Sequence, residues 1–254
     1  MTPFDSALAA FCREPGRSAY AEIDGPLGHW SGGVDAGAPR PAASLLKVPL
    51  AMAVEPLVDD LPPQRVRDLL DRPGDASVLH VLSPDRMLSP SEMLGLMLAA
   101  SDAPCARWAA RSVGLDAVRA VLTSVGAEST TCVADPEFGL LGQTTAFEAI
   151  RLLQAACNAR RYPVSASALE NSIVNSRIPL GATEEDVTVA HKTGTLGGVA
   201  NDVARLTCDA GEVWLAFLSD DQHDTLVTGY EMGVCARALL EAAGLRLERT
   251  VGVL

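Results

Sequence analysis

Aromatic side chains are scarce in this chain. Phe, Trp and Tyr make up 4% of its 254 residues, whereas hydrophobic residues as a whole reach 48%. The hydrophobic content is ample for a buried core, which excludes a disordered chain. The abundance of Ala, Leu and Val favours helices and small-residue packing over an aromatic-rich sandwich. We expect a helix-rich α/β protein.

Positive charge is also in short supply. Lys and Arg number 20 against 32 Asp and Glu, which gives a formal net charge of -12. A chain of that sign repels phosphate backbones and anionic lipid head groups, so nucleic acids and membrane surfaces are excluded as natural partners. A small-molecule substrate is favoured. No pattern in the sequence indicates an oligomeric state.

Targeting signals and paired cysteines are missing as well. The short apolar stretch Ala7–Cys12 follows Asp5 rather than basic residues, so we predict neither a secretion signal nor a membrane span, and we expect a cytoplasmic protein. The six cysteines form no Cys-x-x-Cys pair, which predicts buried, reduced thiols.

Strand-forming patterns occupy both ends of the chain, and helical patterns lie between them. We expect strands at 18–24, 29–33, 187–192, 203–208 and 213–219, and helices from Ser44, from Ser89 towards Ser101, and at 105–112, 115–124, 145–159 and 226–243. The middle of the chain is predicted to be all helical. The two ends, 1–43 and 177–254, are expected to share one sheet as a discontinuous α/β domain, with 44–176 as an inserted helical domain.

Lysine occurs only twice, at Lys47 and Lys192, although Lys and Arg together number 20. A chain that uses arginine almost everywhere has kept lysine at two positions. Guanidinium essentially never gives up its proton, whereas a buried amine can. These two sites are therefore predicted to need an amine.

The first lysine lies in Ser44-Leu45-Leu46-Lys47, at the start of a predicted helix. A spacing of three places the hydroxyl and the amine on one helix face, within hydrogen-bond reach. A neutral amine there could deprotonate the serine, and both burial and the second cation, Lys192, would lower its pKa. The two amines are expected to converge on one hydroxyl where the helices meet the sheet.

Two further motifs are ambiguous when taken alone. Lys192-Thr193-Gly194-Thr195 ends a predicted strand, where Gly194 would let an extended amide substrate approach the backbone, but a surface lysine before a glycine turn has the same pattern. Ser101-Asp102-Ala103 follows the Ser89 helix, and a Ser-Asp pair there is often an ordinary helix cap.

Together, Ser44-x-x-Lys47, Ser101-Asp102-Ala103 and Lys192-Thr193-Gly194 resemble the three signatures of class A β-lactamases and penicillin-binding proteins. The resemblance implies a two-domain fold, an antiparallel sheet flanked by helices plus an all-helical domain, with the active site between them. It implies no metal or organic cofactor.

The same resemblance implies roles for individual residues. Ser44 would attack a carbonyl, Lys47 would take part in deprotonating it, Ser101 would relay protons to the leaving group, and Lys192 would supply positive charge. The backbone N–H groups of Ser44 and Thr195 would form the oxyanion hole, and Thr193 with Thr195 would bind a substrate carboxylate.

The chain departs from that family at two points. Class A β-lactamases hold an Asn where this chain has Ala103, which cannot hydrogen-bond a substrate amide. Their Glu-x-x-Leu-Asn loop holds the deacylating water, whereas Glu137-Phe138-Gly139-Leu140-Leu141 lacks the Asn and lies in a shorter loop. Glu137 is either a water-activating base or a solvated loop carboxylate. We therefore expect acylation with little classical β-lactamase turnover, and an esterase, amidase or acyl-transfer role.

Other functions are weaker candidates. A binding or sensor protein that is acylated slowly, or only holds a ligand in the same cleft, is the main alternative. The acidic stretch Asp220–Asp224 is typical of a solvated turn rather than a metal site, and the histidines lack ligand spacing. No Gly-x-Ser-x-Gly motif occurs, which removes the usual α/β-hydrolase elbow.

Overall fold

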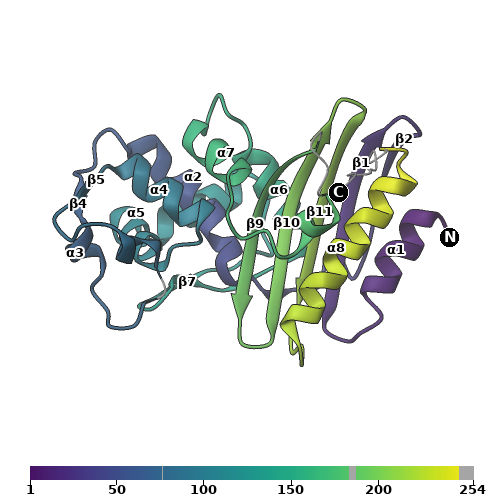
Figure 1. Cartoon of the computed structure of the whole chain (residues 1–254), viewed down its shortest axis with the longest axis horizontal. Coiled ribbons are helices and arrows are strands. Elements are labelled where there is room, and N and C mark those ends of the chain that lie inside the picture. Colours follow the sequence, from purple (N-terminus) through teal and green to yellow (C-terminus); the bar gives the residue numbers. More distant parts are fainter. Residues whose placement is uncertain (76, 183–186, 246–254) are drawn as a thin grey trace, which may run out of the picture.

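The computed structural model describes residues 1–75, 77–182 and 187–245 (Figure 1). Residues 246–254, which the sequence assigns to the sheet domain, lie outside the described part. Five antiparallel strands form one sheet in the order β2-β1-β11-β10-β9. Their bounds are β1 Arg17–Gly25, β2 Gly28–Val34, β9 Thr188–Leu196, β10 Val199–Cys208 and β11 Gly211–Ser219. Because β1 pairs with β11, the prediction that the chain ends share one sheet is confirmed.

Helices cover both faces of this sheet. Helices α1 (Pro3–Phe11) and α8 (Thr225–Ala242) pack on one face and α6 (Ala146–Ala156) on the other. Along β11, Val213 and Phe217 point towards α8, while Trp214 and Leu218 join the core shared with α6. This alternation is the period of two that a strand imposes on its side chains, and it makes β11 a strand buried on both sides.

The remaining helices form a separate group beside the sheet (Figure 1). They are α2 (Lys47–Val54), α3 (Val66–Leu69), α4 (Pro90–Ala99), α5 (Ala103–Ser124) and α7 (Pro163–Glu170). The two helices predicted at 105–112 and 115–124 are one element, α5, interrupted at Gly114, whose φ of 72° is not helical. Glycine adopts that angle without a Cβ clash, so the break falls where the helical pattern of the sequence restarts.

The prediction that the middle of the chain is all helical is wrong. Short antiparallel pairs join β3 (Arg40–Pro41) to β8 (Gln143–Thr144), β4 (Gln64–Arg65) to β5 (Met87–Leu88), and β6 (Val133–Asp135) to β7 (Gly139–Leu141). Segments of two or three residues are too short to show a period of two. The division of the chain at residues 44 and 177 stays a prediction.

A capping box begins α4, the helix that leads to Ser101. The backbone N–H of Glu92 donates to Ser89 Oγ at 3.2 Å, and the backbone N–H of Ser89 donates to the Glu92 carboxylate at 2.7 Å. We expect Ser89→Ala to lower the free energy of unfolding by about 0.5–2 kcal/mol, as measured by denaturant titration. Ser91→Ala, in the same turn but outside the box, is the control. Equal losses in the two variants would contradict the capping role.

Candidate active site

Ser44 lies in a single 3-10 turn, Ala43–Leu46, directly before α2. The turn begins at Ala43, whose backbone is left-handed with a φ of 50°. The residue before it, Ala42, is held by a hydrogen bond from its N–H to the Gly142 carbonyl at 2.9 Å. Left-handed non-glycine residues cluster at functional sites, where the surrounding contacts hold them in place. Ser44 is half-buried at this turn.

The end of β9 packs directly against this turn. A Cβ on Gly194 would lie 2.8 Å from the Ala42 carbonyl oxygen and 3.2 Å from the Ala43 methyl. The sequence predicts that Gly194 lets a substrate approach the backbone. In the structure, the lack of a side chain at Gly194 lets the backbone of Ala42 and Ala43 pack against it. Within the described residues, β9 is nevertheless an edge strand of the sheet, and an edge strand is a position at which an extended ligand can pair.

The two amines meet at Ser101. Lys47 Nζ donates to the Ser101 carbonyl at 2.5 Å and to its hydroxyl at 3.3 Å, and Lys192 Nζ donates to the same hydroxyl at 2.9 Å. Both lysines are buried, with 6% and 1% of their surface exposed. The shared hydroxyl is therefore that of Ser101 rather than Ser44, whose Oγ forms no hydrogen bond within the described part of the chain. Ser44 lies in the 3-10 turn and not in α2. Residues three apart also share a face in a 3-10 turn, but no hydrogen bond joins the Ser44 hydroxyl to Lys47 Nζ.

Burial changes the chemistry of both amines. It lowers the pKa of Lys47 to about 8, with the negative charge of Asp102 acting in the opposite direction. Burial also lowers the pKa of Lys192 well below its ordinary value, and the positive charge of Lys47 adds to that shift. An amine with a pKa near 8 is partly neutral at physiological pH, so Lys47 can accept a proton.

The helix-cap interpretation of the Ser101-Asp102 pair is confirmed for Asp102, and the catalytic role of Ser101 stays a prediction. Asp102 caps α5, because its Oδ1 accepts from the Cys105 N–H at 3.1 Å. Ser101, one residue earlier, has a left-handed φ of 56° and turns both its carbonyl and its hydroxyl towards the amines. Ala103 is the first residue of α5, and its methyl group offers no hydrogen bond.

Ser44 and Lys47 line the same hollow, which also contains Thr195. The hollow is narrow: its empty space is about 320 Å³ when the part open to solvent is included, but only about 10 Å³ of it admits the centre of a water molecule. The rest of the lining is apolar, and its outer wall comes from the β6–β7 hairpin through Phe138, Leu140 and Leu141. Glu137 is exposed in the turn of that hairpin and does not line the hollow, so its part in deacylation stays a prediction.

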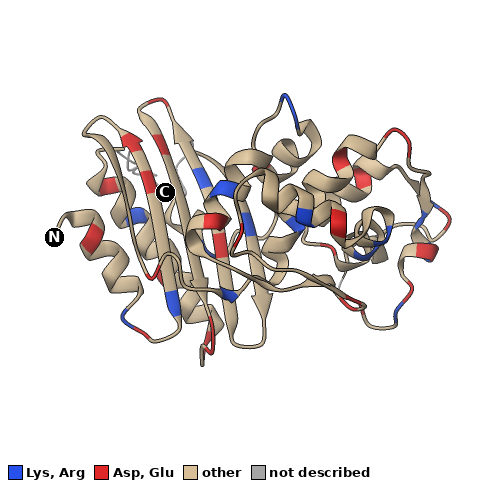
Figure 2. Ribbon diagram, turned by 180° about the vertical axis from the view of Figure 1, so that it is seen from behind, with Lys and Arg blue, Asp and Glu red and all other residues tan. Residues whose placement is uncertain are grey.

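Arg177 is a site residue that the sequence analysis missed. It is 6% exposed, its Nη1 donates to the Gly194 carbonyl at 2.7 Å and to the Asn201 carbonyl, and its Nη2 donates to Thr195 Oγ1 at 2.5 Å. This places a third cation beside Thr195, next to Thr193 of the same strand. Figure 2 shows Lys and Arg segments gathered where the sheet meets the helices. No local motif surrounds Arg177, so only the tertiary structure reveals it.

The described residues contain no group of three or more His, Cys, Asp or Glu side chains placed to hold a metal ion. Within the same residues, no helix has the length and apolar character needed to cross a membrane. Cys105, Cys132 and Cys235 are buried, as predicted, while the other three cysteines are half-buried; none of the six forms a disulfide.

Known structures of β-lactamases and of PBP-A are similar to this chain in fold. The chain is similar over 96% of its length to a β-lactamase from Sphaerobacter thermophilus (26% identity, 97% of that chain, TM-score 0.82). It is also similar in fold to PBP-A (18%, 96% of each chain, TM-score 0.78) and to a class A β-lactamase from Bacteroides cellulosilyticus (16%, 97% of this chain and all of that one, TM-score 0.77). No curated protein matches the sequence.

The family model described as the beta-lactamase enzyme family matches residues 29–241, which include every site residue named above. The observed antiparallel sheet with its flanking helices and separate helical group is the fold of these structures. The chain belongs to the β-lactamase enzyme family and is a serine hydrolase of that type.

Proposed function

We propose that the chain acts through a Ser44 acyl-enzyme on a small amide or ester, a β-lactam or a related compound, with weak or absent classical β-lactamase turnover. The observation that carries this proposal is the meeting of the chain's only two lysines, both buried, at the Ser101 hydroxyl beside the hollow of Ser44. Buried amines with lowered pKa values are costly to keep, and their convergence at one hydroxyl supports acid–base chemistry there.

The contacts support the part of the proton path that runs from Lys47 to Ser101, and the first transfer, from Ser44 to Lys47, is supported by their place in the lining of one hollow. Neutral Lys47 takes the proton of Ser44 as Oγ bonds to the substrate carbonyl carbon, and the carbonyl oxygen becomes an oxyanion held by the N–H groups of Ser44 and Thr195. The proton then passes from Lys47 to Ser101, whose own proton moves to the leaving nitrogen or oxygen as its bond to carbon breaks. Lys192 stabilises the negative charge, and Arg177 strengthens the attraction of Thr193 and Thr195 for a carboxylate.

The wall of the hollow supports slow deacylation. A bound water needs about two to four polar partners. The polar side chains of the lining are Ser44, Lys47 and Thr195, which already have roles in acylation. Phe138, Leu140 and Leu141 add none from their side chains, and Glu137 lies outside the lining. A structure similar in fold to this chain, a PBP-A mutant at 19% identity, is an acyl-enzyme complex with penicillin G. The same apolar wall also supports the alternative function, a penicillin-binding or sensor protein whose adduct is not hydrolysed.

Intact-mass measurement separates these functions. Wild type and Ser44→Ala are incubated with penicillin and with an activated p-nitrophenyl ester, and the adduct is followed over time. Wild type is expected to gain one acyl group that decays with release of product, and Ser44→Ala is expected to gain none. A lasting adduct would favour the sensor. Turnover of a chromogenic cephalosporin at rates typical of resistance enzymes would contradict the weak-turnover proposal.

The pH dependence of acylation follows from the pKa of Lys47, which is about 8. Below that pH the amine carries a proton and cannot take one from Ser44. The acylation rate is therefore expected to rise with pH, by about tenfold per pH unit well below 8, and to level off above it. Stopped-flow release of p-nitrophenol between pH 6 and 9.5 measures the profile. A rate that falls as the pH rises through 8 would contradict the role of Lys47 as base.

A further inference from the structure

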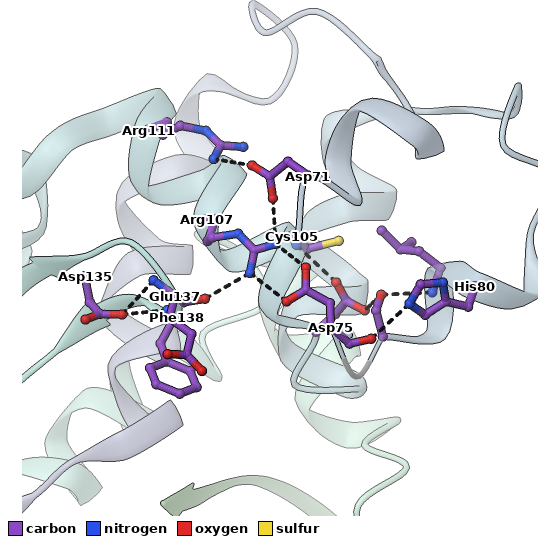
Figure 3. A network of polar contacts seen from close by, with 12 residues as sticks. Asp71, Asp75, His80, Cys105, Arg107, Arg111, Asp135, Glu137 and Phe138 are labelled. Carbon is purple, nitrogen blue, oxygen red and sulfur yellow. Dashed lines mark hydrogen bonds and ion pairs between the residues drawn. The ribbon is translucent and has the colours of Figure 1, made fainter. Parts of the chain in front are cut away.

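Arg107, on α5, is a buried cation that the proposed proton path does not use. Only 3% of its surface is exposed, and it follows Ser101 by six residues, on the helix that Asp102 caps. Figure 3 shows its guanidinium between two carboxylates on one side and the Glu137 segment on the other. Burying a cation in this way is favourable only when its partners are held in good geometry.

The guanidinium bonds to two segments that are distant in sequence. Nη2 donates to Asp71 at 2.7 Å and to Asp75 at 2.5 Å, in the loop after α3. Nη1 donates to Asp75 at 3.2 Å and to the Glu137 carbonyl at 2.9 Å, in the β6–β7 turn. The planar fork of arginine makes these bonds at once, which a single ammonium cannot do.

Each of the two segments reaches the active site. Beyond Asp75, the hydroxyl of Ser77 donates to Asp102 at 2.5 Å and the N–H of Val78 to the same carboxylate at 3.2 Å, next to Ser101. Beyond Glu137, the ring of Phe138 lines the hollow with Ser44. One guanidinium therefore connects the wall beside Ser101 with the wall beside Ser44.

The β6–β7 turn is also pressed against α5 itself. A Cβ on Gly139, whose φ is +84°, would lie 2.9 Å from the Ala106 carbonyl oxygen. Inside the turn, the N–H groups of Glu137 and Phe138 both donate to Asp135 at 2.8 Å. The turn is thus a small rigid unit whose placement depends on its contacts with α5, and the Arg107 bond to the Glu137 carbonyl is one of them.

We propose that Arg107 is a positioning residue for the acylation of Ser44: it fixes the loop of Asp71 and Asp75 and the turn of Glu137 so that Phe138 and Ser101 keep their places around the hollow. This inference rests on the proposed function. Arg107 touches neither the substrate nor the reacting atoms. Burial and, to a smaller extent, the positive charge of Arg107 lower the pKa of Lys47, and a lysine at position 107 keeps that charge. The loss of rate expected in Arg107→Lys therefore comes from the geometry of the walls, where displacements of about 1 Å can cost about a hundredfold.

The test compares Arg107→Lys with Arg111→Lys. Lysine keeps the positive charge beside Asp71 and Asp75 but cannot also reach the Glu137 carbonyl. Arg111 is a matched control, because it also bonds to Asp71, at 3.2 Å, but is exposed and has no hydrogen bond to the Glu137 carbonyl. Two quantities are measured well below the unfolding temperature: amide hydrogen exchange across 135–139 and at Val78, and the rate of Ser44 acylation by penicillin, with kcat and KM resolved for the p-nitrophenyl ester.

For Arg107→Lys we expect exchange about tenfold to a hundredfold faster in the turn and acylation slower by about a hundredfold, mainly in kcat. Arg111→Lys is expected to stay within about twofold of wild type in both. Unchanged exchange in Arg107→Lys overturns the proposal, as does faster exchange with unchanged acylation, which would leave a purely structural role. A wild type that is never acylated refutes the proposed function itself and removes the basis of this inference.

If Arg107→Lys does not fold, Asp75→Asn takes its place. It weakens two of the bonds to the guanidinium while leaving Arg107 and the bond to the Glu137 carbonyl intact. Amide exchange in the turn is again expected to be faster and acylation of Ser44 slower, but by less than in Arg107→Lys, about tenfold for acylation. Wild-type exchange and acylation in a folded Asp75→Asn protein overturn the proposal.

Discussion

Replacing Lys47 with arginine is expected to slow the acylation of Ser44 by about 10²–10⁴-fold, the contribution of a positioned general base. Burial lowers the pKa of Lys47 to about 8, whereas a guanidinium in its place would keep its proton throughout the accessible pH range. The variant retains the positive charge, so the loss would come from the missing base rather than from the electrostatics of the site. The measurement is the rate of adduct formation with penicillin by intact mass.

Lys47→Met separates the charge from the base. It removes the amine while approximately keeping the volume of the side chain, and it is expected to be as slow as Lys47→Arg. Thermal unfolding of both variants shows whether they are folded at the assay temperature. An arginine variant that acylates at the wild-type rate would show that a permanent cation suffices at this position, and the proposed proton path would be wrong.

Ser101→Ala is expected to slow acylation by a similar factor, about 10²–10⁴-fold, because it removes the hydroxyl that contacts both amines. The amines themselves remain held, since Lys47 also donates to the Ser101 backbone carbonyl and Lys192 to that of Thr193. The loss should therefore be chemical rather than structural. Stopped-flow release of p-nitrophenol from the ester gives the rate.

Ser101→Gly is the sharper variant at the same position. The φ of residue 101 is 56°, which glycine adopts more easily than serine or alanine, so the backbone is expected to be at least as stable as in wild type. A stable but slow Ser101→Gly protein supports proton relay by the hydroxyl. Ser124→Ala, at the far end of α5, is the control and should act as wild type does. Full activity in the glycine variant would exclude Ser101 from the relay.

Much of the fold could be predicted from the sequence because its signals are local. Helix α4 begins after Ser89 as predicted, and the β-branched and apolar runs after 187 form three consecutive strands. Helix α6 ends at Ala156 rather than at residue 159, where the apolar spacing alone gives no stop signal. The two-residue and three-residue strand pairs could not be predicted, since tertiary pairing and not periodicity creates them.

The site was predicted less evenly. The scarcity of lysine pointed to Lys47 and Lys192, and both are buried against one hydroxyl. Which hydroxyl they share depends on the 3-10 turn at Ser44 and on the left-handed backbone at Ser101. The spacing of three residues between Ser44 and Lys47 predicts neither of these features. Arg177 and Arg107 were missed because their partners lie far away in the sequence, so no motif marks them.

The most direct test is to locate the penicillin adduct on the chain. Tryptic digestion after brief incubation releases the peptide that ends at Lys47, and fragmentation assigns the added mass to a single residue. The account predicts one acyl group, on Ser44, formed faster at pH 9 than at pH 7. An adduct on Ser101 or on any other residue, or no adduct at all, would contradict it.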